Sequence, residues 1–136
     1  MRIFLDANVL FSAAKSNGAV GRLLGMLVDA GHECWTYGYV VEEARRNLVA
    51  KAPAEAPILD TLLARMHVAA AQPPPAALEA TFAVPEKDRP VLAAAIRLKC
   101  EALVTGDRTH FGAFYGKTFA GVTIYSPKLL AQALLT

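Results

Sequence analysis

Two aspartates in this chain stand at the end of short, mainly apolar runs. Asp6 comes after residues 3–5, and Asp107 follows residues 102–105 with one glycine between them. A carboxylate beside buried apolar segments is costly to remove from water unless hydrogen bonds or a positive charge compensate it. Asp6 therefore either caps a following helix or helps to hold a cation, and the rest of the sequence bears on that choice.

Apolar runs with strand character alternate along the chain with segments of helical spacing. We expect strands at residues 2–5, 33–37, 102–105 and 122–125, and helices ending at residue 14 and spanning 19–30, 40–50, 58–68, 89–100 and 127–135. This alternation predicts the α/β class, with a mainly parallel sheet and helices on both faces. Ligands of such sheets bind at the carboxyl ends of the strands, so Asp6 and Asp107 are expected at one edge.

Length and composition are those of one compact domain. The chain has 136 residues, of which 54% are hydrophobic and 19% charged, so residues 1–136 can bury a single core. The proline-rich run at 72–75 is predicted to be a stiff break within that domain. Cys34 and Cys100 fit neither a disulfide framework nor a metal motif, and no secretory signal or membrane span is evident, so we expect a cytoplasmic protein with reduced thiols. The net charge of +2 does not by itself indicate a nucleic-acid partner.

Asp88 precedes the helix predicted at residues 89–100 and shares its apolar face. On a wheel of about 100° per residue, its carboxylate falls near the middle of the apolar stripe, opposite Arg97. The stripe consists of Val91, Leu92, Ala95, Ile96 and Leu98. Asp88 is thus predicted to point toward the sheet, although a simple capping role, favoured by Pro90, stays open and is compatible with this direction.

A pair of glutamates offers another acid near the same edge. The apolar stripe of the helix predicted at residues 40–50 consists of Val40, Val41, Ala44 and Leu48. Glu43 lies at the edge of that stripe, whereas Glu42 is turned further toward water. Glu43 is therefore the residue predicted to reach a cleft beside the preceding strand. The alternative is that both are solvated glutamates near the amino end of a helix, where the dipole favours them.

The acids predicted at this edge form a candidate metal site. They are Asp6, Glu43, Asp88 and Asp107. Carboxylates this close would repel one another or take up protons, and a divalent cation removes the conflict. Oxygen ligands without paired histidines or cysteines favour Mg²⁺ or Mn²⁺ over zinc. Asn8 and Thr105 add neutral oxygens that can orient the carboxylates or a water molecule.

Four segments contain these acids, and they read, in order, IFLDANVLFSA, YVVEEARRNL, EKDRPVLAAAI and LVTGDRTHF. In this order and spacing they resemble the four acidic motifs of PIN domains, the nuclease fold of the toxins in many bacterial toxin–antitoxin pairs of the VapBC type. The resemblance covers residues 1–111 and implies a three-layer α/β/α sandwich. It places the family's acids at the four positions above, with Asn8 and Thr105 as their polar neighbours.

The resemblance also implies a function and partners. It implies hydrolysis of single-stranded RNA that depends on Mg²⁺ or Mn²⁺ and leaves 5′-phosphate and 3′-hydroxyl ends. Four carboxylates suit one metal ion or two. A cognate antitoxin is the implied protein partner, and the apolar content is also compatible with a homodimer.

Substrate has to be guided to the acids by positive charge, because bare carboxylates repel phosphates. The candidates for binding RNA are Arg46, Arg89 and Arg108, which lie close to the acids in sequence. The stretch DRTHFGAFYGK at residues 107–117 also mixes cations with aromatic side chains that can stack on bases. The simpler interpretation of this stretch is that its aromatics fill the core. His110 as a metal ligand is a lesser alternative.

Other functions of the same fold class fit the sequence less well. A phosphatase with a nucleophilic aspartate after its first strand needs a second acid two residues later, where this chain has Asn8. A receiver domain needs paired acids after that strand. The remaining alternative is a catalytically silent scaffold of the same fold that binds RNA or protein, and the complete set of acids argues against it.

Overall fold

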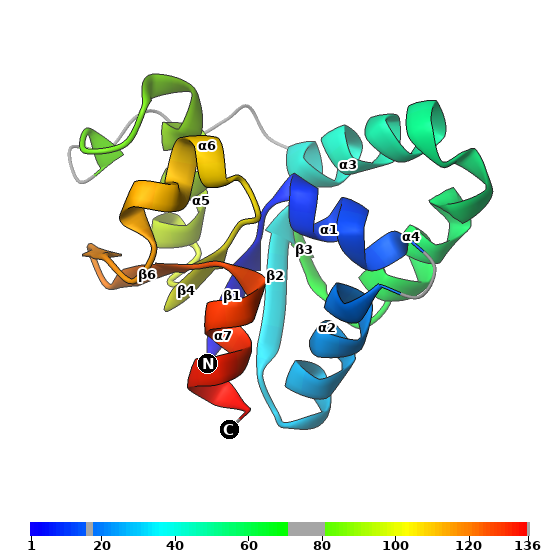
Figure 1. The fold of residues 1–136 in the computed structure, drawn as a ribbon, viewed down its shortest axis with the longest axis horizontal. Coiled ribbons are helices and arrows are strands. Elements are labelled where there is room, and N and C mark those ends of the chain that lie inside the picture. Colours follow the sequence, from blue (N-terminus) through cyan, green and yellow to red (C-terminus); the bar gives the residue numbers. More distant parts are fainter. Residues whose placement is uncertain (16–17, 71–80, 136) are drawn as a thin grey trace.

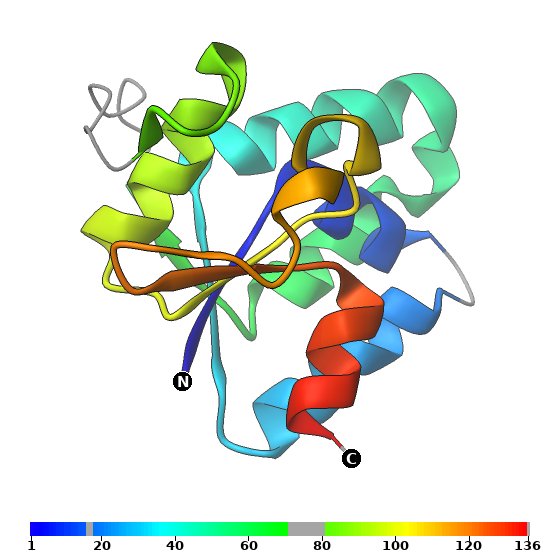
Figure 2. The same cartoon turned by 60° about the vertical axis from the view of Figure 1, so that its left-hand side comes forward.

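The computed structural model describes residues 1–15, 18–70 and 81–135, which form a six-stranded sheet with helices on both faces (Figures 1 and 2). The strands are β1 (Arg2–Leu5), β2 (Glu33–Tyr37), β3 (His67–Ala69), β4 (Ala102–Val104), β5 (Thr118–Phe119) and β6 (Val122–Tyr125). Their order is β3-β2-β1-β4-β6-β5, and only the pair of β5 with β6 is antiparallel. The expected sandwich with a mainly parallel sheet is confirmed.

The first four α-helices lie together on one side of the sheet, and α5 packs against β4 and β6 on the other (Figure 1). The helices are α1 (Ala7–Ala14), α2 (Ala19–Asp29), α3 (Gly38–Lys51), α4 (Ala56–Leu63), α5 (Arg89–Arg97), α6 (Arg108–Phe111) and α7 (Pro127–Leu134), with 3₁₀ turns η1 (Pro53–Glu55), η3 (Glu86–Asp88) and η4 (Gly112–Phe114). Helix α1 contacts α2, α3 and α4, and α7 contacts β6 and α2. Among the described residues, no helix combines the length and apolar character that crossing a membrane requires.

The central strands are apolar because helices cover both of their faces. Every residue of β4 and the last three residues of β1 are buried. Cys34 and Cys100 are buried and unpaired, as expected. Burial raises the pKa of these thiols to about 11 and about 12, so both stay protonated at neutral pH.

One predicted helix was wrong in its second half. The helix expected at residues 58–68 corresponds to α4, which ends at Leu63, and the chain then forms the edge strand β3, parallel to β2. Two of the three residues of β3 are exposed, so the strand has no apolar pattern that reveals it. The helix expected to reach residue 100 ends at Arg97, and Lys99 has a left-handed backbone with a φ of 57°. The predicted proline-rich break at 72–75 lies outside the described residues.

The register of the sheet brings the residues after β1 and β4 to one edge. Leu5 is paired with Val104, and the N–H of Asp6 donates to the carbonyl oxygen of Val104 at 3.1 Å. The N–H of Thr105 in turn donates to the carbonyl oxygen of Tyr125 at 3.0 Å. The segments that begin at Asp6 and at Thr105 therefore start side by side, as the sequence predicted.

Helix α2 approaches the backbone of α1 closely through a glycine. A Cβ atom on Gly21 would lie 2.8 Å from the carbonyl oxygen of Ala13, a distance that real side chains essentially never show. Gly25, one turn further along α2, has no heavy atom nearer than 3.9 Å to the same position. The contact at Gly21 fixes α1, whose first turn carries the polar residues of the edge.

The two glycines make a matched pair for a stability measurement. We expect Gly21→Ala to lower the free energy of unfolding by about 1–3 kcal/mol, because the added methyl group overlaps backbone. Gly25→Ala should raise it by roughly 0.5–1 kcal/mol, since alanine favours the helix and the site is open. Urea denaturation measures the free energy of unfolding of both variants. Equal changes in the two would contradict the close contact of Gly21 with the backbone of α1.

Candidate active site

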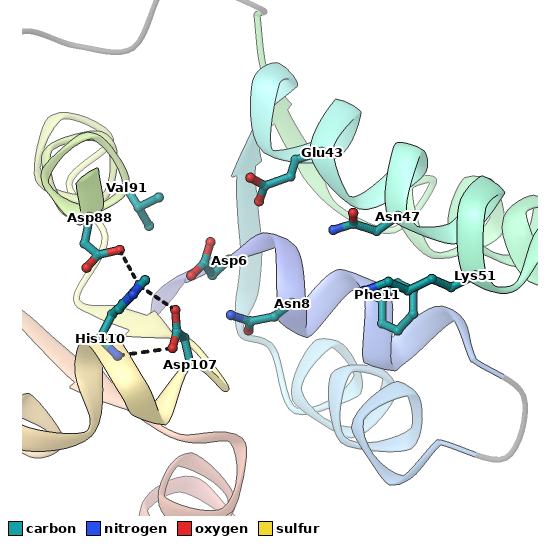
Figure 3. Close-up of a pocket in the computed structure, with 10 residues that line it drawn as sticks. All are labelled: Asp6, Asn8, Phe11, Glu43, Asn47, Lys51, Asp88, Val91, Asp107 and His110. Carbon is teal, nitrogen blue, oxygen red and sulfur yellow. Dashed lines mark hydrogen bonds and ion pairs between the residues drawn. The ribbon is translucent and has the colours of Figure 1, made fainter.

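A cleft of about 470 Å³ opens at the carboxyl edge of the sheet (Figure 3). It is lined by Asp6, Asn8, Phe11, Glu43, Asn47, Lys51, Asp88, Val91, Asp107 and His110. These residues come from α1 and its N-cap, from α3, from η3 and the start of α5, and from α6 and its N-cap. The four carboxylates that the sequence assigned to this edge thus line a single cleft, although they are far apart along the chain.

Asp6 lies at the bottom of the cleft and is almost fully buried, with 8% of its surface exposed. It is the N-cap of α1, where its Oδ1 accepts a hydrogen bond from the N–H of Ala7 at 2.8 Å. The pKa of Asp6 is raised to about 6, mainly by burial and also by the nearby carboxylates of Glu43 and Asp107, against the lowering effect of its hydrogen bonds. Capping and a place in an acidic cluster therefore coexist in this residue.

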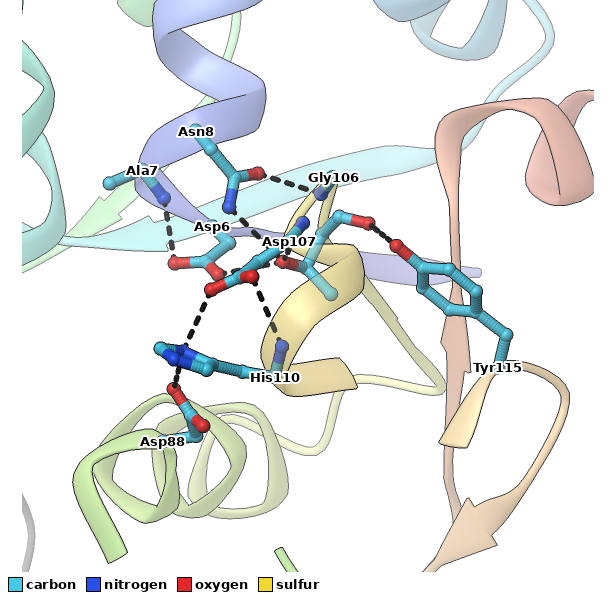
Figure 4. A network of polar contacts seen from close by, with 9 residues as sticks. Asp6, Ala7, Asn8, Asp88, Gly106, Asp107, His110 and Tyr115 are labelled. Carbon is cyan, nitrogen blue, oxygen red and sulfur yellow. Dashed lines mark hydrogen bonds and ion pairs between the residues drawn. The ribbon is translucent and has the colours of Figure 1, made fainter. Parts of the chain in front are cut away.

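The hydroxyl of Thr105 joins the start of α1 to the loop after β4, within the network of polar contacts around Asp6, Asn8 and Asp107 that Figure 4 draws. It donates to Oδ2 of Asp6 at 2.9 Å. It accepts from Nδ2 of Asn8 and from the N–H of Asp107, both at 3.2 Å. Oδ1 of Asn8 accepts in turn from the N–H of Gly106 at 2.7 Å. Since a hydroxyl has one proton and two lone pairs, every bonding position of Thr105 is in use.

His110 lies between the two acids on the opposite wall of the cleft. Its Nδ1 is 2.9 Å from Oδ2 of Asp107 and 3.2 Å from Oδ1 of Asp88. Asp107 also caps α6, because its Oδ1 accepts from the N–H of His110 at 3.1 Å. From the sequence, His110 was only a lesser candidate for a metal ligand, but the structure places its imidazole between the two acids.

Asp88 is 8% exposed and stands at the N-cap position of α5. Its side chain makes no capping hydrogen bond to the helix, so the simple capping alternative was wrong. The carboxylate is directed at His110 instead, toward the cleft (Figure 3). The helical wheel therefore predicted its direction correctly.

The two adjacent glutamates of α3 face different surfaces. Glu43 is exposed and lines the acidic cleft from the wall that faces Asp6 (Figure 3). Glu42 lines a separate groove together with Arg45 and Arg46. The choice of Glu43 over Glu42 agrees with this arrangement.

The arginines proposed for RNA binding do not line the acidic cleft. Arg46 faces the groove of Glu42, and Arg108 lines another groove beside the start of α7. Nε of Arg89 donates to the carbonyl oxygen of Val84 at 3.1 Å, and its guanidinium lies 5.2 Å from the ring centre of Phe82. Long side chains on neighbouring positions point in different directions, which proximity in sequence does not reveal.

The aromatic residues after Asp107 serve mainly the fold. Phe111 is buried in the core, with 1% of its surface exposed. The hydroxyl of Tyr115 donates to the carbonyl oxygen of Thr105 at 2.9 Å and so braces the end of β4. These positions agree with the simpler interpretation of this stretch.

Sequence reasoning missed Phe11, Asn47 and Lys51, which line the cleft away from the histidine cluster. A signal was present, because Asn47 and Lys51 follow Glu43 at intervals of four and therefore share its face of the helix. Within the part of the chain that the structure describes, Lys51 is the basic side chain that lines the acidic cleft, where the sequence predicted arginines.

Comparison with known proteins decides the family. A family model described as PIN domain matches residues 2–109. The chain belongs to the PIN domain family. No curated protein sequence matches the chain significantly.

Two crystal structures illustrate the likeness of this PIN domain to others. One is VapBC2 from Rickettsia felis bound to a DNA fragment from its promoter, with a TM-score of 0.63 and 15% identity, covering 93% of this chain and 98% of that one. The other is Mycobacterium tuberculosis VapC20, a Sarcin–Ricin loop cleaving toxin, with a TM-score of 0.55 and 10% identity, covering 86% and 98%. At these identities the likeness shows the fold.

The residues of this PIN domain fit a divalent cation. Ligand atoms of Asp88, Asp107 and His110 all lie within 4.8 Å of one another. The carboxylate of Asp6 is close enough to this group that Asp107 raises its pKa, so added positive charge would relieve the repulsion. A set dominated by carboxylates suits Mg²⁺ or Mn²⁺, and an imidazole among the ligands favours Mn²⁺ of these two.

Asp6 predicts a pH dependence of stability in the metal-free PIN domain. Because folding raises its pKa from 3.8 to about 6, the folded state binds the proton more tightly, and stability rises as pH falls through about 6. Asp6→Asn removes this titration. The difference in unfolding free energy between Asp6→Asn and the parent should change by on the order of 1 kcal/mol between roughly pH 7.5 and pH 5, in favour of the parent at the lower pH. Denaturation in EDTA measures it, and a difference that does not vary with pH would contradict the buried charge.

Thr105 allows a second test of the site. Thr105→Val keeps the shape but leaves the partners of the hydroxyl without their hydrogen bonds, so we expect a loss of about 2–4 kcal/mol in unfolding free energy. Thr105→Ser keeps the hydroxyl and should cost only about 1 kcal/mol for the lost methyl group. Thermal and urea denaturation of both variants measure the contrast. A valine variant as stable as the serine variant would show that the hydroxyl does not join the segments.

Proposed function

We propose that this PIN domain is an endoribonuclease that hydrolyses phosphodiester bonds of single-stranded RNA with Mg²⁺ or Mn²⁺. The observation that carries the proposal is the convergence of four carboxylates in one cleft. Membership of the PIN domain family supports it. The residues proposed to hold the cation or cations are Asp6, Glu43, Asp88 and Asp107, with His110 as a further ligand.

The residues of this chain have defined tasks in the proposed reaction. Thr105 and the N–H of Ala7 hold both oxygens of Asp6 in place. Asn8 ties the start of α1 to the loop after β4 through Gly106, so the two halves of the acidic cluster keep a constant spacing. A divalent cation in such a site supplies activation of water for attack on phosphorus and neutralises charge in the transition state. Preorganised ligands of this kind lower the cost of reaching that state.

The shape of the cleft supports a single strand as substrate. Helix α3 forms one wall, α5 and α6 form the other, and the start of α1 forms the floor between them (Figure 3). A flexible single strand can enter between such walls and turn its bases outward, whereas an A-form duplex is read mainly across its wide minor groove. Arg46, Arg89 and Arg108 line other surfaces and are proposed only as outer contacts to the RNA.

The proposed biological role is that of a toxin in a toxin–antitoxin pair, acting in the cytoplasm as a single domain over residues 1–136. The fold is similar to that of a chain in the VapBC2 structure and to that of VapC20, a Sarcin–Ricin loop cleaving toxin. The proposed partner is a cognate antitoxin, and a homodimer is a further proposal.

Adjacent glutamates provide a matched test of the nuclease. We expect Glu43→Gln to reduce the rate of cleavage of a labelled single-stranded RNA in Mn²⁺ by roughly 100-fold, because a carboxylate of the metal cluster is lost. Glu42→Gln removes the same charge one position away, on the other surface, and should leave the rate within about twofold of the parent. Excess EDTA should abolish cleavage by all three proteins.

Two results would count against the nuclease. Equal rates of RNA cleavage by Glu43→Gln and Glu42→Gln would show that Glu43 has no special role in the reaction. If the parent binds RNA but cleaves none in either Mg²⁺ or Mn²⁺, the catalytically silent scaffold replaces the nuclease.

A further inference from the structure

The acidic cleft has a second arm that the proposed hydrolysis does not use. Phe11, Asn47 and Lys51 line the same cleft as the acids but lie away from His110 (Figure 3). This arm contains an aromatic ring, a side-chain amide and a cation, whereas the other end contains carboxylates. One cavity therefore changes character along its length.

The change follows the two helices that border the cleft. Glu43, Asn47 and Lys51 succeed each other at intervals of four on α3, or about 6 Å along its axis per step. On α1, Asp6 and Phe11 are separated by about 7.5 Å along the axis. Because α1 and α3 pack side by side, the carboxylates of both lie at one end and the ring and cation lie at the other.

Phe11 is half-buried, and two lysines approach its ring. The Nζ atoms of Lys15 and Lys51 lie 5.4 and 5.8 Å from the centre of its ring. Both lysine side chains are exposed, so they can leave the ring and follow a phosphate when a flat base takes their place. A partly exposed ring beside lysines and an amide is the combination that binds single-stranded nucleic acid, through stacking, hydrogen bonds and backbone charge.

We propose that Phe11, Asn47 and Lys51, with Lys15, form a nucleotide subsite that positions single-stranded RNA for cleavage. An unpaired base stacks on Phe11, Asn47 bonds to its edge, and the lysines bind the adjacent phosphate. The strand then runs along the cleft toward the carboxylates, where a neighbouring phosphate meets the cation site. This inference rests on the proposed nuclease function and deepens it by assigning the residues that position the substrate.

The groove of Arg108 is a weaker candidate for this task. It contains Lys128 and Tyr115, but it is a separate depression that the carboxylates do not line. The arm at Phe11 shares one continuous cavity with the acids. A strand bound there reaches the acids without leaving the cavity.

Binding measured apart from cleavage tests the subsite. The probe is a fluorescent single-stranded RNA of roughly 10 nucleotides, and the proteins carry Asp107→Asn so that it stays intact. We expect Lys51→Gln to weaken binding about 10-fold and to reduce the salt dependence by roughly one phosphate contact. Lys99→Gln makes the same change of charge in the segment between α5 and β4, at the opposite edge of the sheet, and should leave binding within about twofold.

The role of Phe11 is tested by measuring its interaction with a single RNA base. Phe11→Leu should weaken binding about 5- to 100-fold, while Phe11→Trp, which keeps an aromatic face, should retain it. A set of RNAs, each lacking the base at one position, is then bound to both proteins. At the position that stacks on Phe11, removal of the base should weaken binding to the protein with Phe11 but not to the Phe11→Leu variant, since either change removes the same stacking contact. Additive losses at every position would overturn the proposal, as would unchanged binding by Lys51→Gln.

Kinetics without the Asp107 change separate this inference from the nuclease itself. Lys51→Gln should raise KM about 10-fold with kcat within about twofold, as a positioning residue does. A parent that cleaves RNA while its Lys51→Gln and Phe11→Leu variants match it would overturn the subsite alone. A parent that binds but does not cleave, with both variants weakened, would overturn the nuclease while the subsite stands.

Discussion

Repulsion between carboxylates at one edge of the sheet is the constraint on which the rest of the site depends. The parallel strands β1 and β4 bring Asp6 and Asp107 together, and the local structure compensates only part of the cost. Thr105 and a helix N-terminus hold Asp6, and His110 stands between the other acids. The raised pKa of Asp6 is the part left uncompensated, and it comes mainly from burial, with a smaller part from the carboxylates of Glu43 and Asp107. A bound cation would remove this electrostatic cost. The carboxylates that are unfavourable without a metal ion are therefore the same ones that are proposed to hold it.

The fold and the acids of the cleft were largely predictable because they follow from regular periodicity. Residues 2–5 and 33–37 form strands with the expected bounds, and the wheel gave the directions of Asp88 and Glu43. A strand buried on both faces is recognisable by its continuous apolar run. The edge strand β3 is not, because it is short and mostly exposed, and a helical pattern upstream continues into it.

The basic side chains of the cleft could not be predicted from periodicity in the same way. Arg46 and Arg89 lie close to acids in sequence, yet Arg46 faces another groove and Arg89 bonds to a nearby backbone carbonyl. Lys51 reaches the cleft from two turns beyond Glu43, which only the helical spacing connects. The resulting cleft has carboxylates at one end and a ring with lysines at the other. This difference in charge between the two ends would orient an RNA strand. A phosphate at the lysine end is bound directly, whereas a phosphate at the acidic end is bound only when a metal ion is present.

Anomalous diffraction from crystals soaked in Mn²⁺ tests the central claim most directly, because it locates the cation without relying on activity. The account predicts a peak in the cleft, within coordination distance of oxygens from Asp6, Asp88 and Asp107, and loss of that peak in crystals of Asp107→Asn. A peak elsewhere on the surface, or none in this cleft at saturating Mn²⁺, would contradict the view that these carboxylates are gathered to hold a metal ion.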